Sequence, residues 1–324
     1  MNHAELNDRR AELKAAMPGL LDLAETNLYR RLPRLYPELF AEVRASNDAK
    51  APYRCHLAEL MMEHLGLEPG LRSRVLVSHG VRRSLSSLFT ILAARGVESL
   101  VPGDVYPVYG ELARRAGASF TEYAARDGLP PREALDSFGA LLVCDPLKPW
   151  GGSLTPAECD RISAWSRGGD RIAIVDAAYS FRPSPHIEAM AREGACCLLG
   201  SLSKGWLIPD HLGYCFLPEQ WTREARSAFA ALPKDESKLR VGFAALSEDP
   251  NRPSRVAGVL ARLAERMEGE LHHRRIPAAA VSGYFTRTPL DFQSLLDAGC
   301  VGIPASVFGA PDDAGCLVST LGLE

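Results

Sequence analysis

Short apolar runs alternate with helical segments through the middle of the chain, from about residue 74 onward. Runs that are apolar at nearly every position are typical of strands buried on both faces. Strands separated by helices predict an α/β domain, with a mostly parallel sheet covered by helices on both faces. The predicted strands are 74–78, 99–102, 139–144, 171–176, 195–199 and 212–216.

The two ends of the chain have a different pattern of predicted helices and strands. Residues 5–45 predict one or two helices, broken at Pro18 and Pro33, and residues 56–66 predict another helix. After residue 222 a helical stretch, 254–271, precedes weaker strand signals at 278–285 and 316–321. We therefore expect three segments. These are an N-terminal helical segment (1–50) that packs with the small domain, a large α/β domain (51–222) and a small α+β domain (223–324).

Composition and charge narrow the class of protein. The chain has 324 residues, of which 46% are apolar and 24% charged, as is usual for a globular enzyme. A formal net charge of -3 and the lack of a long basic block argue against binding to nucleic acid or to a membrane surface. The N-terminus lacks the apolar segment of a signal peptide, and no apolar run is long enough to span a bilayer. We expect a cytoplasmic protein.

The cysteines and histidines do not form a recognisable metal motif. None of the eight cysteines belongs to a Cys-x-x-Cys pair, and Cys144, Cys196 and Cys197 fall inside predicted strands. They are interpreted as small buried hydrophobic residues in a reducing compartment. His272 and His273 lie in a charged helical stretch, which predicts a solvated helix face.

Lys204 is the residue with the most informative position. It follows the predicted buried strand 195–199, where an ammonium group is poorly solvated. Either its side chain extends to water, or its amine is held as a Schiff base. The preceding predicted strand ends at Asp176, and Tyr179 follows three residues later. Because ligands of open parallel sheets bind beyond the carboxyl ends of the strands, Asp145, Asp176 and Lys204 are expected to converge on one cleft.

The order strand-Asp-Ala-x-Tyr, then strand-Ser-x-Ser-Lys, resembles the core of the fold type I enzymes dependent on pyridoxal 5'-phosphate (PLP), the aminotransferase class I/II superfamily. The resemblance covers roughly residues 50–322 and is densest from 75 to 217. It implies that PLP forms a Schiff base with Lys204, which then shuttles protons, that Asp176 pairs with the pyridinium nitrogen, and that Tyr179 bonds the phenolic oxygen. An aspartate capping a turn and a packing tyrosine are the alternatives.

The resemblance also implies a phosphate cradle. Residues 78–84 resemble the superfamily's glycine turn, in which backbone amides at a helix N-terminus receive the phosphate. Of the two serines before Lys204, Ser201 is the one expected to reach the phosphate, and Tyr53 resembles a tyrosine that reaches it across a subunit interface. The implied cofactor contacts around the phosphate are Gly80, Val81, Arg82, Ser201, Ser203 and Tyr53.

Two loops resemble those that surround the pyridine ring. Residues 100–109 resemble the segment Val-Pro-x-Pro-x-Tyr-Pro-x-Tyr, which implies that Tyr106 stacks on the ring rather than being an ordinary loop tyrosine. Residues 145–155 track the loop Asn-Pro-x-Asn-Pro-Thr-Gly, with Lys148 in place of the asparagine at the phenolic oxygen. An ammonium there favours the ionised phenolate; the alternative is that Lys148 points to solvent.

The sequence departs from the family pattern at two further positions. His211 stands where an arginine usually binds the phosphate, so Arg82 or Arg83 is expected to supply the charge. Val318 stands where an arginine usually clamps the substrate carboxylate, and no arginine follows Arg287. Arg287 is the nearest candidate for the clamp, and a surface arginine is the alternative.

Three functions remain open at this stage. The first is an aminotransferase acting on an unusual amino acid or amine, in specialised metabolism. The second is a PLP-dependent lyase, cyclase, replacement enzyme or oxidase on the same fold. The third is a non-catalytic relative, which the joint presence of Asp176, Tyr179 and Lys204 argues against. The resemblance implies a homodimer, because superfamily sites are usually built across a two-fold interface.

Overall fold

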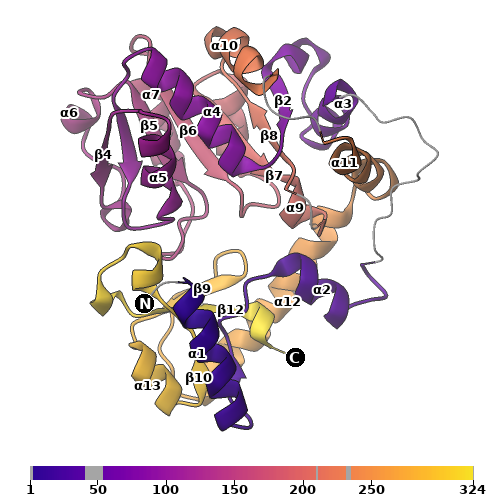
Figure 1. Cartoon of the computed structure of the whole chain (residues 1–324), viewed down its shortest axis with the longest axis vertical. Coiled ribbons are helices and arrows are strands. Elements are labelled where there is room, and N and C mark those ends of the chain that lie inside the picture. Colours follow the sequence, from indigo (N-terminus) through magenta and orange to yellow (C-terminus); the bar gives the residue numbers. More distant parts are fainter. Residues whose placement is uncertain (1–2, 41–53, 209–210, 231–234, 324) are drawn as a thin grey trace.

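A seven-stranded sheet forms the centre of the larger part of the molecule (Figure 1). The computed structural model describes residues 3–40, 54–208, 211–230 and 235–323. The strand order is β2-β8-β7-β6-β5-β3-β4, and β8 alone runs in the direction opposite to the other six strands. The strands are β2 (Val75–Ser78), β3 (Ser99–Pro102), β4 (Phe120–Tyr123), β5 (Ala140–Cys144), β6 (Ile172–Ala177), β7 (Cys196–Ser201) and β8 (Gly213–Phe216).

The sheet confirms the predicted α/β class, and each of the six predicted strands is present within two residues at either end. The sequence did not predict β4, which pairs with β3 at the sheet edge. Its residues are only partly buried, and Thr121 and Glu122 are exposed, so the strand lacks the continuous apolar pattern of the others.

Helices cover both faces of the sheet. Successive strand residues point to opposite sides, and because both sets are apolar, each face must be buried against helices. Leu141 and Val143 of β5 belong to one buried cluster and Leu142 to the other. On the first face lie α3 (Arg54–His64), α6 (Arg132–Leu135), α7 (Pro156–Ser166), α8 (Pro185–Arg192) and α11 (Glu236–Glu248). On the second lie α4 (Val81–Ala94), α5 (Val108–Arg115) and α10 (Glu219–Ala230).

A smaller unit is built from both ends of the chain. Its core joins Leu28 and Leu32 to Val256, Leu263 and residues of the C-terminal strands. In Figure 1 the N-terminal helices lie beside the C-terminal strands. The elements are α1 (His3–Ala16), β1 (Leu21–Asp22), α2 (Leu28–Leu35), α12 (Arg252–His273), β9 (Phe285–Thr288), α13 (Phe292–Asp297), β10 (Cys300–Val301), β11 (Ile303–Pro304) and β12 (Cys316–Ser319).

The small unit contains two sheets. Strands β11, β12 and β9 form an antiparallel sheet in that order, and β1 pairs in parallel with β10. The strand expected at 278–285 instead begins at Phe285. The expected helix break at Pro33 is wrong, because Pro33 lies inside α2. The helix ends two residues later, so the missing N–H removes one backbone bond from a turn that is already terminating.

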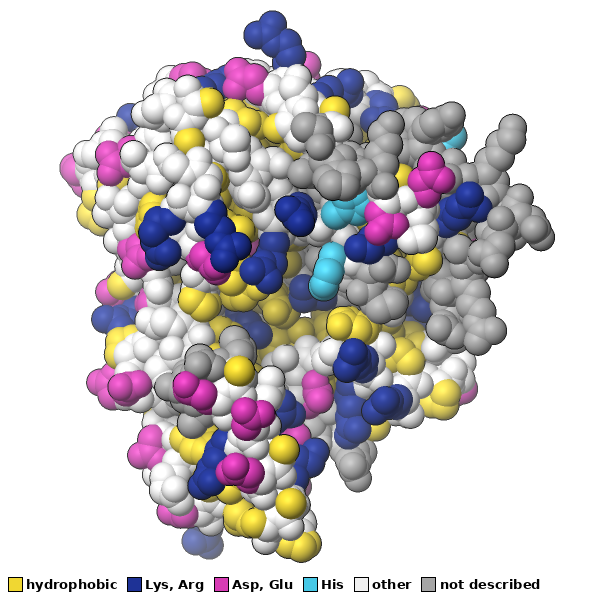
Figure 2. Space-filling view, viewed as in Figure 1, with side chains coloured by type: hydrophobic (Ala, Val, Ile, Leu, Met, Phe, Trp, Pro, Cys, Tyr) yellow, Lys and Arg dark blue, Asp and Glu magenta, His cyan; other side chains and the backbone are white. Residues whose placement is uncertain are grey.

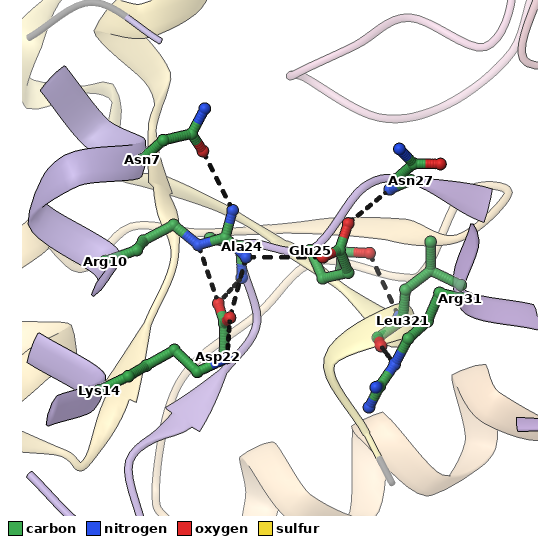
Figure 3. Close-up of polar contacts among 10 residues, drawn as sticks. Asn7, Arg10, Lys14, Asp22, Ala24, Glu25, Asn27, Arg31 and Leu321 are labelled. Atoms are coloured by element: carbon green, nitrogen blue, oxygen red, sulfur yellow. Dashed lines mark hydrogen bonds and ion pairs between the residues drawn. The ribbon is translucent and has the colours of Figure 1, made fainter. Parts of the chain in front are cut away.

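Polar contacts hold the N-terminal elements in place (Figure 3). The carboxylate of Asp22 accepts hydrogen bonds from Arg10, at 2.8 and 3.1 Å, and from Lys14 at 3.1 Å. Arg31 donates to the carbonyl of Leu321 at 3.0 Å. These bonds connect α1, β1 and α2 with the C-terminal end of the chain.

The division of the chain at residues 50 and 222 stays a prediction. The N-terminal residues share their core with the small unit, which supports the first part of it. Helices α10 and α11, however, pack against the large sheet, with Trp221 and Leu239 buried on its two faces. The packing thus places the start of the small unit nearer to α12.

Candidate active site

Two neighbouring strands end at the same edge of the large sheet and carry the central residues of the site. Asp176 lies near the end of β6, paired with Leu199 of β7. Strand β7 leads into the short helix α9 (Leu202–Gly205), which carries Lys204. Asp176 and Lys204 therefore lie at the carboxyl ends of adjacent parallel strands, where open α/β sheets bind ligands.

Asp176 is buried and held by two hydrogen bonds. The hydroxyl of Tyr109 donates to its Oδ2 at 2.8 Å, and the backbone N–H of Ala178 donates to its Oδ1 at 2.9 Å. Burial raises the pKa of Asp176, while these two bonds and the charge of Lys204 oppose the rise. Such a carboxylate gains stability from a cation placed beside it.

Lys204 lies against the ring of Tyr179. Its Nζ is 4.3 Å from the ring centroid. Burial lowers the pKa of the Lys204 amine, and the charge of Asp176 opposes that effect. A lysine with a lowered pKa has a larger neutral fraction at neutral pH, and the neutral amine is the nucleophile that attacks a carbonyl.

Lys148 occupies a second position against the same tyrosine. Its Nζ lies 4.7 Å from the ring centroid of Tyr179, 4.1 Å from that of Phe285 and 4.8 Å from that of Phe308. Burial, with a further contribution from Lys204, lowers the pKa of Lys148 to about 7. Lys148 therefore lies among aromatic rings, and the alternative that it extends into solvent is not what the structure has.

The loop that carries Lys148 is fixed by hydrogen bonds. Asp145 at its start accepts a bond from the N–H of Leu154 at 2.8 Å, and the hydroxyl of Ser180 donates to the Asp145 carboxylate at 3.2 Å. The indole N–H of Trp150 donates to the carbonyl of Asp104 at 2.8 Å. Asp145, which was expected in the cleft, thus serves to hold the loop.

The turn before α4 has the features of an anion site. Gly80 precedes the helix with a φ of 89°, and no side chain caps the first N–H groups. A Cβ at Gly80 would meet Cβ of His211 at 3.3 Å, so His211 lies directly beside the turn. Val81 is the first residue of the helix. Arg82, on the same turn, is exposed, and its charge opposes the rise that burial causes in the pKa of Tyr106.

The serines before Lys204 have different surroundings. Ser203 is buried, and its hydroxyl accepts a hydrogen bond from the N–H of Leu212 at 3.3 Å, which ties α9 to the start of β8. Ser201 is only partly buried and makes no side-chain cap for α9. This difference supports the expectation that Ser201, rather than Ser203, is the serine free to contact a phosphate. Tyr53 lies outside the described residues.

Arg287 has partners other than a substrate. It lies on β9, and its Nη1 donates to the carbonyl of Ala314 at 2.9 Å. Its guanidinium carbon is 5.5 Å from the ring centroid of Trp150. Val318, on the neighbouring strand, is fully buried. The arrangement gives Arg287 a role in joining β9 to the Lys148 loop, and its assignment as a carboxylate clamp stays a prediction.

Three residues of the site were not predicted from sequence. Tyr109 was part of the loop segment that drew attention to Tyr106, and its ring lies 5.6 Å from the Tyr106 ring. Its spacing of three residues from Tyr106 at a helix start was the available signal. Phe285 and Phe308 come from the small unit and carry no polar group that marks them as part of a site.

The arrangement fits PLP on its own chemistry. A buried carboxylate, a lysine with a lowered pKa and an uncapped helix start lie around one sheet edge. Figure 2 shows the surface hollowed between the large and small units, with basic and apolar side chains around the hollow. A cavity of about 710 Å³ is lined in part by Tyr179 and Trp206, and Lys204 and Asp176 are not among its lining residues.

Other classes of site find little support in the described part of the chain. There, no three side chains of His, Cys, Asp or Glu are grouped so that they could hold a metal ion. His272 and His273 are exposed on α12, as predicted. Cys197 and Cys215 are buried on neighbouring strands. None of the described helices combines the length and the apolarity needed to cross a bilayer.

Comparison with known proteins agrees with this geometry. A histidinol-phosphate aminotransferase of Methanosarcina mazei is 28% identical over 177 residues, which are 52% of this chain and 47% of that protein. The matched stretch is thus about half of the relative's length. A methionine aminotransferase of Escherichia coli has a TM-score of 0.74 at 16% identity, covering 98% of this chain and 93% of that one. The histidinol-phosphate aminotransferase of Clostridium acetobutylicum has a TM-score of 0.72 at 15% identity, covering 93% and 94%.

The structural matches establish the fold, and the sequence match to a family model establishes the family. The model of aminotransferase classes I and II matches residues 46–312, which include both strand ends of the site and the part of the small unit from α12 to β11. The chain belongs to the class I and II aminotransferase family.

Proposed function

We propose that this protein is a PLP-dependent aminotransferase that acts on an amino acid or a related amine. The observation that carries the proposal is the pairing of Asp176 and Lys204 at the ends of adjacent strands, each with a pKa shifted by burial. When bound, PLP supplies an aldehyde that captures amines and a ring that accepts electrons from the substrate. The remaining chemistry is assigned to side chains of the chain itself.

Asp176 keeps a proton on the pyridine nitrogen. Its carboxylate is fixed by Tyr109 and by the N–H of Ala178, so its orientation does not depend on the ligand. A carboxylate beside a protonated ring nitrogen also regains the counter-charge that burial removed. Tyr109 acts here as a positioning residue, because it touches Asp176 and not the reacting atoms.

Lys204 attaches the aldehyde and later moves a proton at the substrate Cα. Its neutral fraction suits the first task, since attack on a carbonyl needs the free lone pair. Its place against Tyr179 keeps the side chain on one side of the site. Tyr179 donates a hydrogen bond to the phenolic oxygen, and burial, which raises its pKa, keeps it protonated for that purpose.

The start of α4 receives the phosphate. Backbone N–H groups at a helix N-terminus bind anions, and Gly80 lets the chain approach closely. Arg82 and His211 lie on and beside this turn and supply positive charge or hydrogen bonds that the missing arginine would give. Tyr106 stacks on the ring from the segment before α5.

The test begins with the purified protein. It is expected to be yellow and to retain the cofactor on Lys204 after reduction with borohydride; a colourless protein that traps none contradicts the proposal. A single-turnover screen of amino acids and amines then follows, with mass detection. An aminotransferase converts the cofactor to pyridoxamine phosphate and releases an oxo product. Release of ammonia with unchanged cofactor would instead assign elimination or a related reaction such as oxidation.

The proposed assembly is a homodimer with one site at each side of the two-fold axis. Light scattering after size-exclusion chromatography measures this directly. A monomer that nevertheless binds PLP and turns over amines would show that the site is complete within one chain.

A further inference from the structure

The amine of Lys148 is buried among aromatic rings. Its Nζ faces the rings of Tyr179, Phe285 and Phe308 at 4.1 to 4.8 Å. The rings come from three separate segments, one after β6, one on β9 and one before Gly309 in the small unit. Hydrogen bonds of Asp145 and Trp150 fix the loop that carries Lys148. The position of the Lys148 amine is therefore set by the fold of this loop.

The positive charge of Lys148 is not neutralised by an acidic side chain of the described residues. In the described residues, no carboxylate forms an ion pair with it, and the ionisable group that acts on its pKa is Lys204, which repels it. Further titratable groups beside this pair are Tyr179, on whose ring both amines lie, Asp176, which acts on Lys204, and the thiol of Cys144, which interacts with the backbone of Lys148. Rings attract a cation only modestly compared with an anion, so an anionic ligand would satisfy Lys148 better than the protein does.

The other two basic side chains of this region, Lys204 and Arg287, already have other partners or roles. Lys204 attaches the cofactor under the proposed function. Arg287 bonds the carbonyl of Ala314 and stacks near Trp150. Position 318, where the family register places the clamping arginine, holds a fully buried valine. Of these positively charged groups beside Tyr179 and β9, Lys148 is the one that remains for a substrate.

We propose that Lys148 holds the carboxylate of the substrate, in place of the arginine that β12 lacks. The inference rests on the proposed function, because it concerns the same site. An ammonium binds a carboxylate as a point charge, whereas a guanidinium binds it through two parallel bonds in a fixed plane. The site therefore selects for an acid group near Lys148 but tolerates variation in its angle, as an enzyme for an unusual amino acid requires.

The experiment uses the PLP-loaded enzyme and two unreactive probes. 3-Phenylpropionate carries a carboxylate but no amine, and 3-phenylpropanamide is its uncharged match. Dissociation constants come from calorimetry or from the change in cofactor absorbance. The wild type is expected to bind the acid at least about tenfold more tightly than the amide, as a charged hydrogen bond warrants. Equal affinities in the wild type would overturn the inference.

Variants then assign the preference to a residue. Lys148→Met is expected to abolish the preference for the acid, while Arg287→Met and the surface control Lys238→Met keep it. If Lys148→Met retains the preference, or if Arg287→Met removes it, the inference is overturned.

A second variant covers the case in which Lys148→Met does not load PLP. Lys148→Arg keeps the charge but changes its shape, so it is expected to alter the dissociation constant of the acid and leave that of the amide unchanged. Unchanged constants for both probes would overturn the inference. Failure of the proposed function itself is seen separately, as a wild-type protein that does not trap cofactor on Lys204.

Discussion

The hydroxyl of Tyr109 donates a 2.8 Å hydrogen bond to Oδ2 of Asp176 in the buried end of β6. This bond opposes the rise in the Asp176 pKa that burial causes. Tyr109→Phe removes it, so the carboxyl becomes harder to ionise and pairs less well with a protonated ring nitrogen. We expect PLP to bind about tenfold more weakly, which corresponds to one charged hydrogen bond. Fluorescence titration of the cofactor-free protein measures the change.

The control for that prediction is a tyrosine on strand β4 of the large sheet. Tyr123 donates to the carbonyl of Leu142 at 3.0 Å and has no contact with Asp176. Tyr123→Phe is expected to lower stability without changing the affinity for PLP. A loss of affinity equal to that of Tyr109→Phe would mean that the effect comes from general loosening of the sheet.

Gly80→Ala should damage the phosphate site. The residue has a φ of 89°, and an added Cβ would lie 3.3 Å from Cβ of His211. With a ψ of 161° as well, the backbone lies in a region that is essentially restricted to glycine, where an alanine costs about 1–3 kcal/mol. Relief of this strain would turn the first N–H groups of α4 away from the phosphate. We expect weaker binding of PLP and of inorganic phosphate. Gly96→Ala is the matched control, since Gly96 also has a positive φ, of 65°, but lies just after α4 with open space around it.

Lys148 should make stability depend on pH. Its pKa is about 7 in the folded protein and 10.5 ordinarily, so between these values the unfolded chain binds the additional proton. The free energy of unfolding therefore rises with pH across this window, by at most about 1.4 kcal/mol per pH unit from this group. The penalty of burying the charge is complete below pH 7 and is lost as the pH approaches 10.5.

Urea unfolding of the cofactor-free protein across that window measures the effect. Lys148→Met is expected to show a smaller slope than the wild type, with its greatest relative stabilisation at the low-pH end. Lys238→Met, at a partly exposed ion pair, is expected to keep the wild-type slope. A slope in Lys148→Met equal to the wild type would show that Lys148 keeps its ordinary pKa.

Arg74 should be important for stability rather than for activity. It is buried, its Nε donates to the carbonyl of Leu217 at 2.6 Å, and its Nη1 donates to that of Arg192 at 2.7 Å. A third bond reaches Ala191, so one guanidinium closes the end of α8. Arg74→Met leaves these carbonyls without a partner, and we expect a loss of about 2–4 kcal/mol. Arg167→Met, at an exposed ion pair, should change the free energy of unfolding by less than about 1 kcal/mol.

The sequence predicted what depends on continuous burial and on chain order. Residues 172–175 of β6 and 196–199 of β7 are apolar at every position, so their pattern has few alternatives, and Asp176 and Lys204 come after these two runs. Strand β4 was missed because an edge strand exposes Thr121 and Glu122 to water. The short strands of the small unit were placed poorly because two to four residues carry too little periodicity.

Contacts between distant segments could not be predicted in the same way. The bond from Tyr109 to Asp176 depends on how α5 sits over the sheet. The rings of Phe285 and Phe308 reach Lys148 only after the small unit has packed against the large one. Sequence could state that Lys148 replaces a usual asparagine, but whether it faced solvent or the site was a matter of tertiary packing.

The small unit needs residues from both ends of the chain, and this sets an order on folding during synthesis. Strand β1 finds its partner β10, and Leu28 and Leu32 find the residues of β12, only after nearly the whole chain has left the ribosome. The large sheet is complete once β8 has been made. We therefore expect the large sheet next to Lys204 to fold first. The apolar faces of α1 and α2 then stay exposed to solvent until the C-terminal strands have been synthesised and pack against them.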